Sequence, residues 1–195
     1  MARMLSPEIR ERFLNAALKL VAQNGVHNKS TAAIGKEEGS ASGTLFLYFP
    51  TKQDLVSELV LQISRENSAY IKSTLSQDLS VRDTFWTIWK GYIHWFLAHK
   101  DAYLYVRQIM DSGLVLDEVA QETGENLDYY FAAIQKGVAG GAIKSYPAEL
   151  IGGILYQDIV AVMNLIREQP DWTKREEIIQ AGFEIFWSGI KSGNA

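Results

Sequence analysis

The sequence predicts an all-α protein. Apolar residues recur at intervals of three and four along most of the chain, and no stretch shows the alternation of apolar and polar residues that is typical of a strand. Capping residues, glycines and prolines divide this pattern into about nine helical segments. With 47% hydrophobic and 22% charged residues, the composition is that of a globular protein with a buried core.

Several classes of protein are disfavoured by composition alone. The 195-residue chain contains no cysteine, so a disulfide framework and a thiolate metal site are both excluded. The first residues lack the apolar core of a signal peptide, and no window approaches the roughly 18 apolar residues of a membrane span. We therefore expect a cytoplasmic protein without a membrane partner, a metal or another cofactor.

The first 52 residues predict three short helices, each bounded by a capping serine or by a helix-ending glycine or proline. The predicted segments are 7–24, 30–39 and 42–49. A sharp turn after Gly39 separates the second helix from the third. These proportions are those of a helix-turn-helix, whose second helix enters the major groove of DNA.

The third segment carries side chains suited to DNA. Ser42 and Thr44 can hydrogen-bond bases, and Gly43 allows close approach of the backbone. The Tyr48 hydroxyl and the Lys52 ammonium group are placed to reach phosphates. The segment therefore predicts a surface that reads bases with small polar groups.

Two further sets of residues complete this prediction. Thr31, in the first turn of the second helix, is placed to contact the adjacent DNA backbone. The apolar residues of the third helix are expected to pack in the core or between the domains and not to contact bases; they are Leu45, Leu47 and Phe49.

Charge is distributed unevenly along the chain. Residues 1–52 hold seven Lys or Arg and four Glu, a net +3, whereas the remainder holds 12 basic and 19 acidic residues, a net −7. No charged residue occurs from Gly39 to Thr51, so attraction to phosphates must come from flanking cations. These are Arg3, Arg10, Arg12, Lys29, Lys36 and Lys52. We expect DNA binding with a shallow dependence on salt.

The run G-T-L-F-L-Y-F-P-T-K-Q-D-L, which begins at Gly43, resembles the DNA-binding domain of the TetR family of transcriptional regulators. The resemblance implies a DNA-binding domain over 1–52, a helical ligand-binding and dimerisation domain over 53–195, and a homodimer. It places DNA contacts on Thr31, Ser42, Gly43, Thr44, Phe46, Tyr48 and Lys52. Phe46 departs from the family pattern, because tyrosine is common there.

The rest of the chain predicts six more helices. The first links the two domains, and Ser80 with Asp83 forms a capping box for the second. Gly140 and Gly141 end the fourth, and Pro170 separates the last two. The predicted segments are 52–75, 80–99, 100–112, 116–138, 148–168 and 173–191.

Residues 85–96 form a helix rich in aromatic side chains. One face holds Phe85, Trp89, Tyr92 and Phe96, which either fill a core or line a cavity for a flat or apolar ligand. This segment resembles the RamR-like subgroup, whose members sense bulky hydrophobic or cationic compounds. The resemblance implies an effector of that kind.

Two polar residues interrupt the apolar run of the predicted helix 148–168. Asp158 and Asn164 are candidates to contact the effector, and a carboxylate near aromatic rings favours a cation. Asp158 can equally lie on a dimer or solvent face. His94 and His99 are five residues apart and do not share a helical face, so they do not indicate a metal site.

The last two helices are candidates for a dimer interface. Their apolar stripes contain small residues that permit close approach of two subunits in a four-helix arrangement. The predicted interface residues are Gly152, Ile159, Met163, Ile179, Gly182, Phe183, Phe186 and Ile190. The alternative is that these stripes face the core of their own subunit.

Together these features predict a ligand-responsive repressor. A homodimer would bind a palindromic double-stranded operator and be released by a small hydrophobic or cationic effector. An enzyme is disfavoured, because the glycine-rich stretches 39–43 and 137–141 match no nucleophile elbow, dinucleotide loop or phosphate loop. The remaining alternative is a helical module that binds proteins or a membrane surface rather than DNA.

Overall fold

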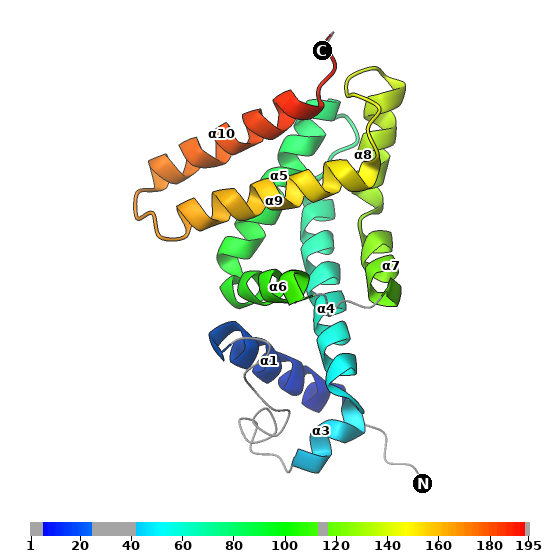
Figure 1. Cartoon of the computed structure of the whole chain (residues 1–195), viewed down its shortest axis with the longest axis vertical. Coiled ribbons are helices and arrows are strands. Elements are labelled where there is room, and N and C mark those ends of the chain that lie inside the picture. Colours follow the sequence, from blue (N-terminus) through cyan, green and yellow to red (C-terminus); the bar gives the residue numbers. More distant parts are fainter. Residues whose placement is uncertain (1–5, 25–41, 113–116, 194–195) are drawn as a thin grey trace. The chain divides into compact units, whose positions relative to one another are not determined.

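The computed structural model describes residues 6–24, 42–112 and 117–193, which are almost entirely helical (Figure 1). The helices are α1 (Pro7–Asn24), α3 (Ser42–Tyr48), α4 (Lys52–Thr74), α5 (Val81–Ala98), α6 (Lys100–Ser112), α7 (Asp117–Asn126), α8 (Asp128–Ala139), α9 (Ala148–Ile166) and α10 (Trp172–Ile190). Within these ranges, β-structure is limited to an isolated bridge between Ile143 and Lys191. The all-α prediction is confirmed; the predicted helix 30–39 lies outside the described residues.

Two helices begin with a hydrogen bond from a backbone amide to a capping side chain, and at α4 this bond is reciprocal. At α5 the Asp83 amide donates to the Ser80 hydroxyl oxygen over 3.1 Å, and that hydroxyl donates to the Asp83 carboxylate over 2.7 Å. At α4 the Thr51 amide donates to the Asp54 carboxylate over 2.8 Å, and the Asp54 amide donates to the Thr51 hydroxyl oxygen over 3.1 Å. These caps satisfy amides that lack partners within the helix. The predicted cap at Ser80 is confirmed.

The predicted helix 116–138 is wrong in one respect, because it is broken into α7 and α8 at Leu127. The backbone of Leu127 (φ −96°, ψ 21°) lies outside the helical region. The Asp128 carboxylate accepts a hydrogen bond from the Tyr129 amide over 2.7 Å and pairs with Lys72 over 2.7 Å. Such short-range bonds from an aspartate compete with the helical pattern and favour a restart.

The contacts divide the chain into two compact units. Unit 1 comprises 1–66 and 99–126, and unit 2 comprises 67–98 and 127–195, so α4 contributes residues to both. The predicted domains 1–52 and 53–195 group the chain differently, since α1 packs against α6 within unit 1. That division by function stays a prediction.

Unit 1 is held together by an apolar core and by buried and ionic polar contacts. Phe13 on α1 is completely buried, and the buried Tyr105 hydroxyl on α6 donates to the Val56 carbonyl over 3.1 Å. Burial raises the pKa of Tyr105, so it remains a neutral donor. At the surface, Glu58 lies 2.9 Å from the Arg10 guanidinium and 3.3 Å from that of Arg65.

Unit 2 has an aromatic core between α5, α8, α9 and α10. The Trp89 indole N–H donates to the Ile179 carbonyl over 3.0 Å, and the Phe183 and Phe186 rings pack on the Trp89 ring at centroid distances of 6.1 Å. A β-carbon at Gly182 would lie 2.5 Å from Val162 Cγ2 and 3.0 Å from the Trp89 ring. Glycine at this position therefore allows α10 to approach α9 and α5 closely.

Helix α9 is more apolar than the sequence analysis recognised. By length and composition alone it would suffice to cross a membrane, contrary to the expectation that no segment would. It packs against α10 and α5, and its buried residues include Ile151, Leu155 and Ile166, yet only 33% of its apolar window is buried within the subunit. The exposed apolar residues of α9, which include Ile154 and Leu165, favour a second covering surface.

Candidate nucleic-acid interface and ligand site

The apolar residues in and next to α3 fall into a buried group and an exposed group. Leu45 and the adjoining Phe49 are buried, at 1% and 3% exposure, as predicted. Leu47 was also expected in the core, and this prediction is wrong, because its side chain is 66% exposed. The neighbouring Phe46 is 45% exposed. The reason lies in helical geometry, since successive side chains project about 100° apart and a short helix buries only one face.

Tyr48 fastens the end of α3 to the start of α1. Its hydroxyl oxygen accepts a hydrogen bond from the Ser6 amide over 3.1 Å, and its ring packs on Phe13 with centroids 5.7 Å apart. The oxygen is thereby occupied as an acceptor while the hydroxyl proton can still be donated. Tyr48 thus combines a structural contact with a donor of the kind expected to reach a phosphate.

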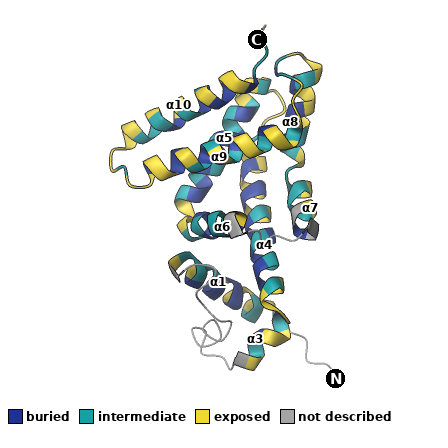
Figure 2. Ribbon diagram, viewed as in Figure 1, coloured by how far each residue is buried: buried dark blue, intermediate teal, exposed yellow. Residues whose placement is uncertain are grey.

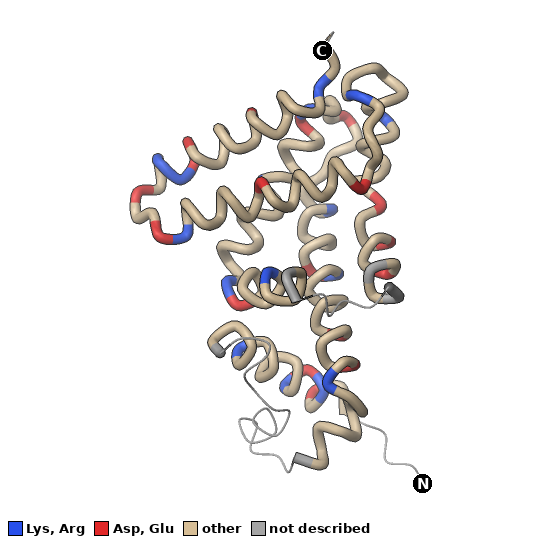
Figure 3. The backbone as a smooth tube through the Cα atoms, viewed as in Figure 1, with Lys and Arg blue, Asp and Glu red and all other residues tan. Residues whose placement is uncertain are grey.

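The remaining predicted contacts differ in how far the structure describes them. Gly43 is exposed, Thr44 is half-buried, and Lys52 is exposed at the start of α4. Thr31 and the side chain of Ser42 lie outside the described residues, as do Arg3, Lys29 and Lys36. Figure 3 shows that the described part of α3 carries neither acidic nor basic residues.

Arg10 is engaged within unit 1. Its guanidinium pairs with Glu58 over 2.9 Å and lies over the Phe49 ring, 5.4 Å from the centroid. Arg10 was predicted to attract phosphates, but these two contacts engage its guanidinium within the fold. Arg12 remains exposed on the same helix.

The aromatic face of α5 forms the core of unit 2. Phe85 and Trp89 have no exposed surface, and Phe96 is 5% exposed. Phe85 packs edge-on against Tyr130, with centroids 6.2 Å apart. Of the two alternatives left open by the sequence, these contacts favour core packing. Contact of these residues with an effector stays a prediction.

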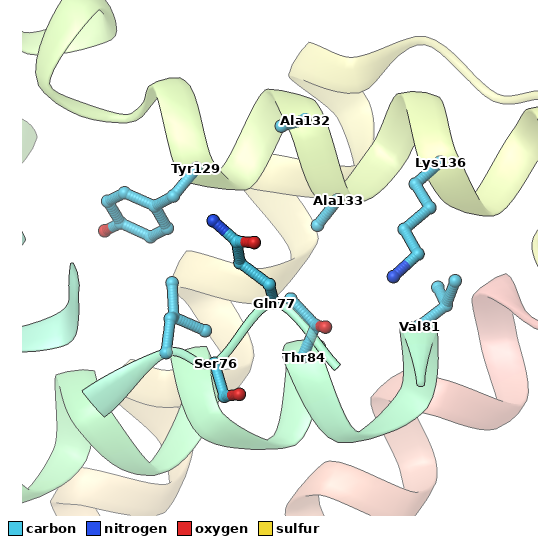
Figure 4. A pocket seen from close by; sticks show the side chains of 9 residues that line it. Ser76, Gln77, Val81, Thr84, Tyr129, Ala132, Ala133 and Lys136 are labelled. Carbon is cyan, nitrogen blue, oxygen red and sulfur yellow. The ribbon is translucent and has the colours of Figure 1, made fainter. Parts of the chain in front are cut away.

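Unit 2 contains a cavity of about 300 Å³ at the end of α4 (Figure 4). The connecting segment after α4, the first turns of α5 and one side of α8 form its wall. Its lining residues are Leu75, Ser76, Gln77, Val81, Thr84, Tyr129, Ala132, Ala133 and Lys136. Figure 4 shows Tyr129 and Lys136 at opposite ends of the α8 wall, with the small side chains of Ala132 and Ala133 between them.

Among the predicted ligand residues, Tyr92 bonds to a side chain that lines this cavity, that of Tyr129. Its hydroxyl lies 3.2 Å from that of Tyr129, within hydrogen-bond distance. Burial raises the pKa of both phenols, so the pair stays neutral. Lys136 is the one charged residue in the lining, and its ammonium group donates to the Leu79 carbonyl over 3.1 Å. The cavity is therefore apolar with a cationic end.

Asp158 and Asn164 do not line this cavity. Asn164 is exposed on α9. Asp158 is partly exposed and follows Ile154 by one helical turn, in a stripe that continues through Ala161 to Leu165. Burial among these neighbours raises the pKa of the Asp158 carboxyl. The structure thus favours the alternative that Asp158 lies on an outward face.

The predicted dimer residues are turned inward, which corrects the face assigned from sequence. Ile159, Met163, Ile179, Phe183, Phe186 and Ile190 are all 3% exposed or less within a single chain. A β-carbon at Gly152 would lie 3.2 Å from the Tyr130 hydroxyl, and Gly182 is enclosed by Val162 and Trp89. Their packing partners belong to the same subunit, so these residues form its core. Dimerisation itself stays a prediction.

Figure 2 shows exposed residues along α9 and α10, and a second set of apolar residues is among them. Ile154 is 43% exposed, Leu165 63% and Ile185 72%. Ala161 and Ala181 are exposed beside them, and Ile178 is half-buried. This set was not predicted from sequence, although the high apolar content of α9 was a signal that more than one of its faces would be covered.

Family models account for nearly the whole chain. Residues 13–59 match the model described as bacterial regulatory proteins, tetR family. Residues 60–192, which are more than half of the chain, match the model described as tetracyclin repressor-like, C-terminal domain. The chain belongs to the TetR family. The TetR assignment from the run beginning at Gly43 is thereby confirmed.

Several curated TetR-like regulators are similar over part of their length. The uncharacterized HTH-type transcriptional regulator YvdT of Bacillus subtilis is 28% identical over 130 residues, or 65% of this chain and 63% of that protein. The HTH-type transcriptional regulator BetI of Vibrio campbellii is 36% identical over 78 residues, or 40% of this chain and 39% of that protein. The matches thus span less than two thirds of either relative. Both relatives are named as transcriptional regulators.

Solved structures extend the similarity over the fold. A TetR-family chain from Shewanella sp. PV-4 has a TM-score of 0.86 at 26% identity and covers 93% of this chain and 97% of its own. The fatty acid degradation regulator FadR from Bacillus halodurans has a TM-score of 0.71 at 18% identity, with 95% and 97% covered. At that lower identity the similarity supports the fold alone.

Proposed function

We propose that this TetR-family chain is a cytoplasmic transcriptional repressor that binds a palindromic DNA operator as a homodimer and responds to a small apolar effector. The observation that carries the proposal is the coincidence of the family match over 13–59 with α3, a short helix whose outward side chains are uncharged and exposed. A surface of this kind suits the edges of bases more than the phosphates.

Phosphate contacts in this arrangement come from a few groups. Lys52 is exposed at the start of α4, and the Tyr48 hydroxyl retains a proton to donate. Because α3 itself contributes no cation, operator affinity should fall only gently with salt. The variant Ser42→Lys should steepen the slope of log affinity against log salt by about 0.9 for each added phosphate contact. An unchanged slope would contradict this account of the electrostatics.

Dimerisation is proposed to use the outward stripes of α9 and α10. Ile154, Leu165 and Ile185 are large apolar residues that stay 43%, 63% and 72% exposed within a single subunit. Two copies related by a two-fold axis would bring these stripes together as a four-helix interface. Such a dimer would present two copies of α3 to successive major grooves.

The effector is proposed to bind in the cavity at the end of α4. Its apolar wall suits a hydrophobic body, and Lys136 favours a neutral or anionic group over the cation that Asp158 had suggested. Helix α4 runs from Lys52, shortly after α3 in sequence, to Thr74, beside the cavity-lining Leu75. A ligand that prefers one arrangement of α4 would therefore shift the population competent for DNA.

Selection of bound sequences from random DNA by the purified full chain tests the central proposal. An enriched palindrome supports a dimeric DNA-binding regulator, and failure to enrich any sequence contradicts it. The latter result would favour the alternative of a helical protein-interaction module, for which the exposed Leu47 would be the contact surface.

Calorimetric titration tests the cavity with three eight-carbon probes, an alcohol, a carboxylate and an amine. We expect the alcohol and the carboxylate to bind more tightly than the amine. The variant Ala132→Trp fills the mouth of the cavity from an exposed position, so it should abolish binding while the fold persists. Equal binding of the amine, or binding that survives Ala132→Trp, would contradict the site.

A further inference from the structure

The exposed apolar residues of α3 are unusual for a short surface helix. Phe46 and Leu47 are adjacent, and together they present two large apolar side chains at 45% and 66% exposure. Surface helices of soluble proteins normally direct charged or polar residues outward. The sequence Ser42–Tyr48 contains no charged residue that would offset this apolar surface.

The residues one turn before Leu47 on α3 are small. A β-carbon at Gly43 would meet nothing within 4 Å among the described residues, and Gly43 lies one turn before Leu47 on the helix. Thr44 precedes Leu47 by three residues, so its methyl and hydroxyl groups share that side. A flat partner can therefore approach α3 closely along the side that Leu47 occupies.

The major groove of DNA offers one apolar feature to such a surface. Phosphates are charged and carry no sequence information, whereas the 5-methyl group of thymine is apolar and distinguishes thymine from cytosine. Hydroxyl groups such as that of Thr44 can hydrogen-bond the polar edges of bases. Aliphatic and aromatic side chains cannot form such bonds, so they gain only from apolar contacts. The chemistry of the exposed pair therefore matches thymine methyl groups.

We propose that Leu47, together with Phe46, reads the 5-methyl groups of thymines in each operator half-site and is the main apolar determinant of sequence specificity. This inference rests on the proposed DNA-binding function and adds to it a base identity and the residue that selects it. Lys52 and Tyr48 then hold the backbone, and the apolar pair distinguishes sequences.

The test uses the operator obtained by selection and replaces its thymines with deoxyuridine one position at a time. Deoxyuridine retains every hydrogen-bonding group of thymine and lacks only the methyl group. Affinity is measured by fluorescence anisotropy of labelled DNA with the full-length protein. Loss of one buried methyl should weaken binding by about fourfold at the contacted thymines and leave the others unchanged.

Protein variants connect the effect to the two side chains. Leu47→Ala should bind thymine and deoxyuridine operators equally at the position it contacts, and Phe46→Ala should do the same at its own position. The matched control is Met110→Ala, which removes a side chain that is 53% exposed on α6 of unit 1 and should preserve full sensitivity to the methyl group.

The outcomes separate this inference from the function beneath it. An enriched operator whose affinity is unaffected by deoxyuridine at every position overturns the inference and leaves DNA binding intact. Sensitivity that persists unchanged in both Leu47→Ala and Phe46→Ala also overturns it, because other groups would then contact the methyls. Failure to select any DNA refutes both proposals together.

Discussion

Helices α3 and α5 are both rich in apolar residues, but α5 buries its large apolar side chains and α3 leaves two of them exposed. α5 buries Phe85 and Trp89 completely, whereas α3 leaves Phe46 and Leu47 largely exposed. Removal of apolar surface from water is the main favourable term in folding, so the α5 side chains stabilise unit 2. The α3 pair provides little of that stabilisation and remains available to a partner.

The difference arises from what each helix packs against. α5 contacts α8, α9 and α10, which surround its aromatic face within unit 2. The seven-residue helix α3 buries one face through Leu45, and its other described residues are exposed or half-buried. Apolar composition alone therefore does not distinguish a core helix from a binding helix. The distinction depends on how many faces of the helix are covered by neighbouring helices.

The largest effect expected on this comparison comes from Trp89→Ala. Loss of a fully buried indole and of its hydrogen bond to the Ile179 carbonyl should lower the free energy of unfolding by about 3 to 5 kcal/mol. Urea denaturation followed by circular dichroism measures the change. Trp172→Ala is the control, because that side chain is 56% exposed and should cost less than about 1 kcal/mol. Equal losses would show that α5 is not the core.

A smaller loss is expected for Gly182→Ala. The added methyl would lie 2.5 Å from Val162 Cγ2, so α10 must shift away from α9 at a cost of about 1 to 3 kcal/mol. Gly189→Ala is its matched control on the same helix, since a β-carbon there meets nothing within 4 Å among the described residues. That variant should be neutral or stabilising by up to about 1 kcal/mol, because alanine favours the helix.

The outward stripe of α9 extends the comparison to the proposed dimer. Burial raises the pKa of the Asp158 carboxyl, and a second subunit would raise that pKa further. The dimer therefore binds the proton more tightly than the monomer, so it is strongest at low pH and weakens as pH rises through the monomer and then the dimer pKa. Asp158→Asn removes the charge and should tighten the dimer at pH 7 by roughly threefold to tenfold.

Sedimentation velocity across a range of pH measures this effect. Glu125→Gln, an exposed charge on α7, is the control and should leave the pH dependence of association unchanged. If Asp158→Asn dissociates at the same concentration as the unaltered protein at every pH, this stripe is not the interface.

The smallest effect on stability is expected for Leu47→Ala. The side chain is 66% exposed, so its loss should change the free energy of unfolding by no more than about 0.5 kcal/mol. The same denaturation experiment used for Trp89→Ala provides the direct contrast. A loss above 1 kcal/mol would mean that Leu47 is covered in solution and that α3 and α5 are alike after all.

Local features were predictable from sequence, because their causes lie within a few residues. The cap formed by Ser80 and Asp83 depends on residues three apart, and the family run from Gly43 is contiguous. Features that depend on distant segments were not predictable in the same way. Leu47 resembles its buried neighbour Leu45 in type, and only the tertiary packing assigns them opposite faces.

The dimer face and the cavity illustrate the same limit. Ile159 and Leu165 lie on one apolar helix, so the pattern did not reveal which of them would meet α10 and which would remain exposed. The cavity arises because folding brings Ala132 and Ala133 together with Leu75, which is far away in sequence, in one lining. A cavity of this kind forms where folding brings small residues together, so no local sequence motif predicts it.

The placement of tryptophan gives the molecule a built-in optical reporter. All five indoles, Trp86, Trp89, Trp95, Trp172 and Trp187, belong to unit 2, and the entire sequence assigned to unit 1 has none. Tryptophan emission, unlike that of tyrosine residues such as Tyr48 in α3, therefore reports on unit 2 alone. A change in tryptophan emission when DNA binds at α3 would mean that the surroundings of tryptophans in unit 2 change as well. A single unlabelled sample can therefore reveal coupling between the two units.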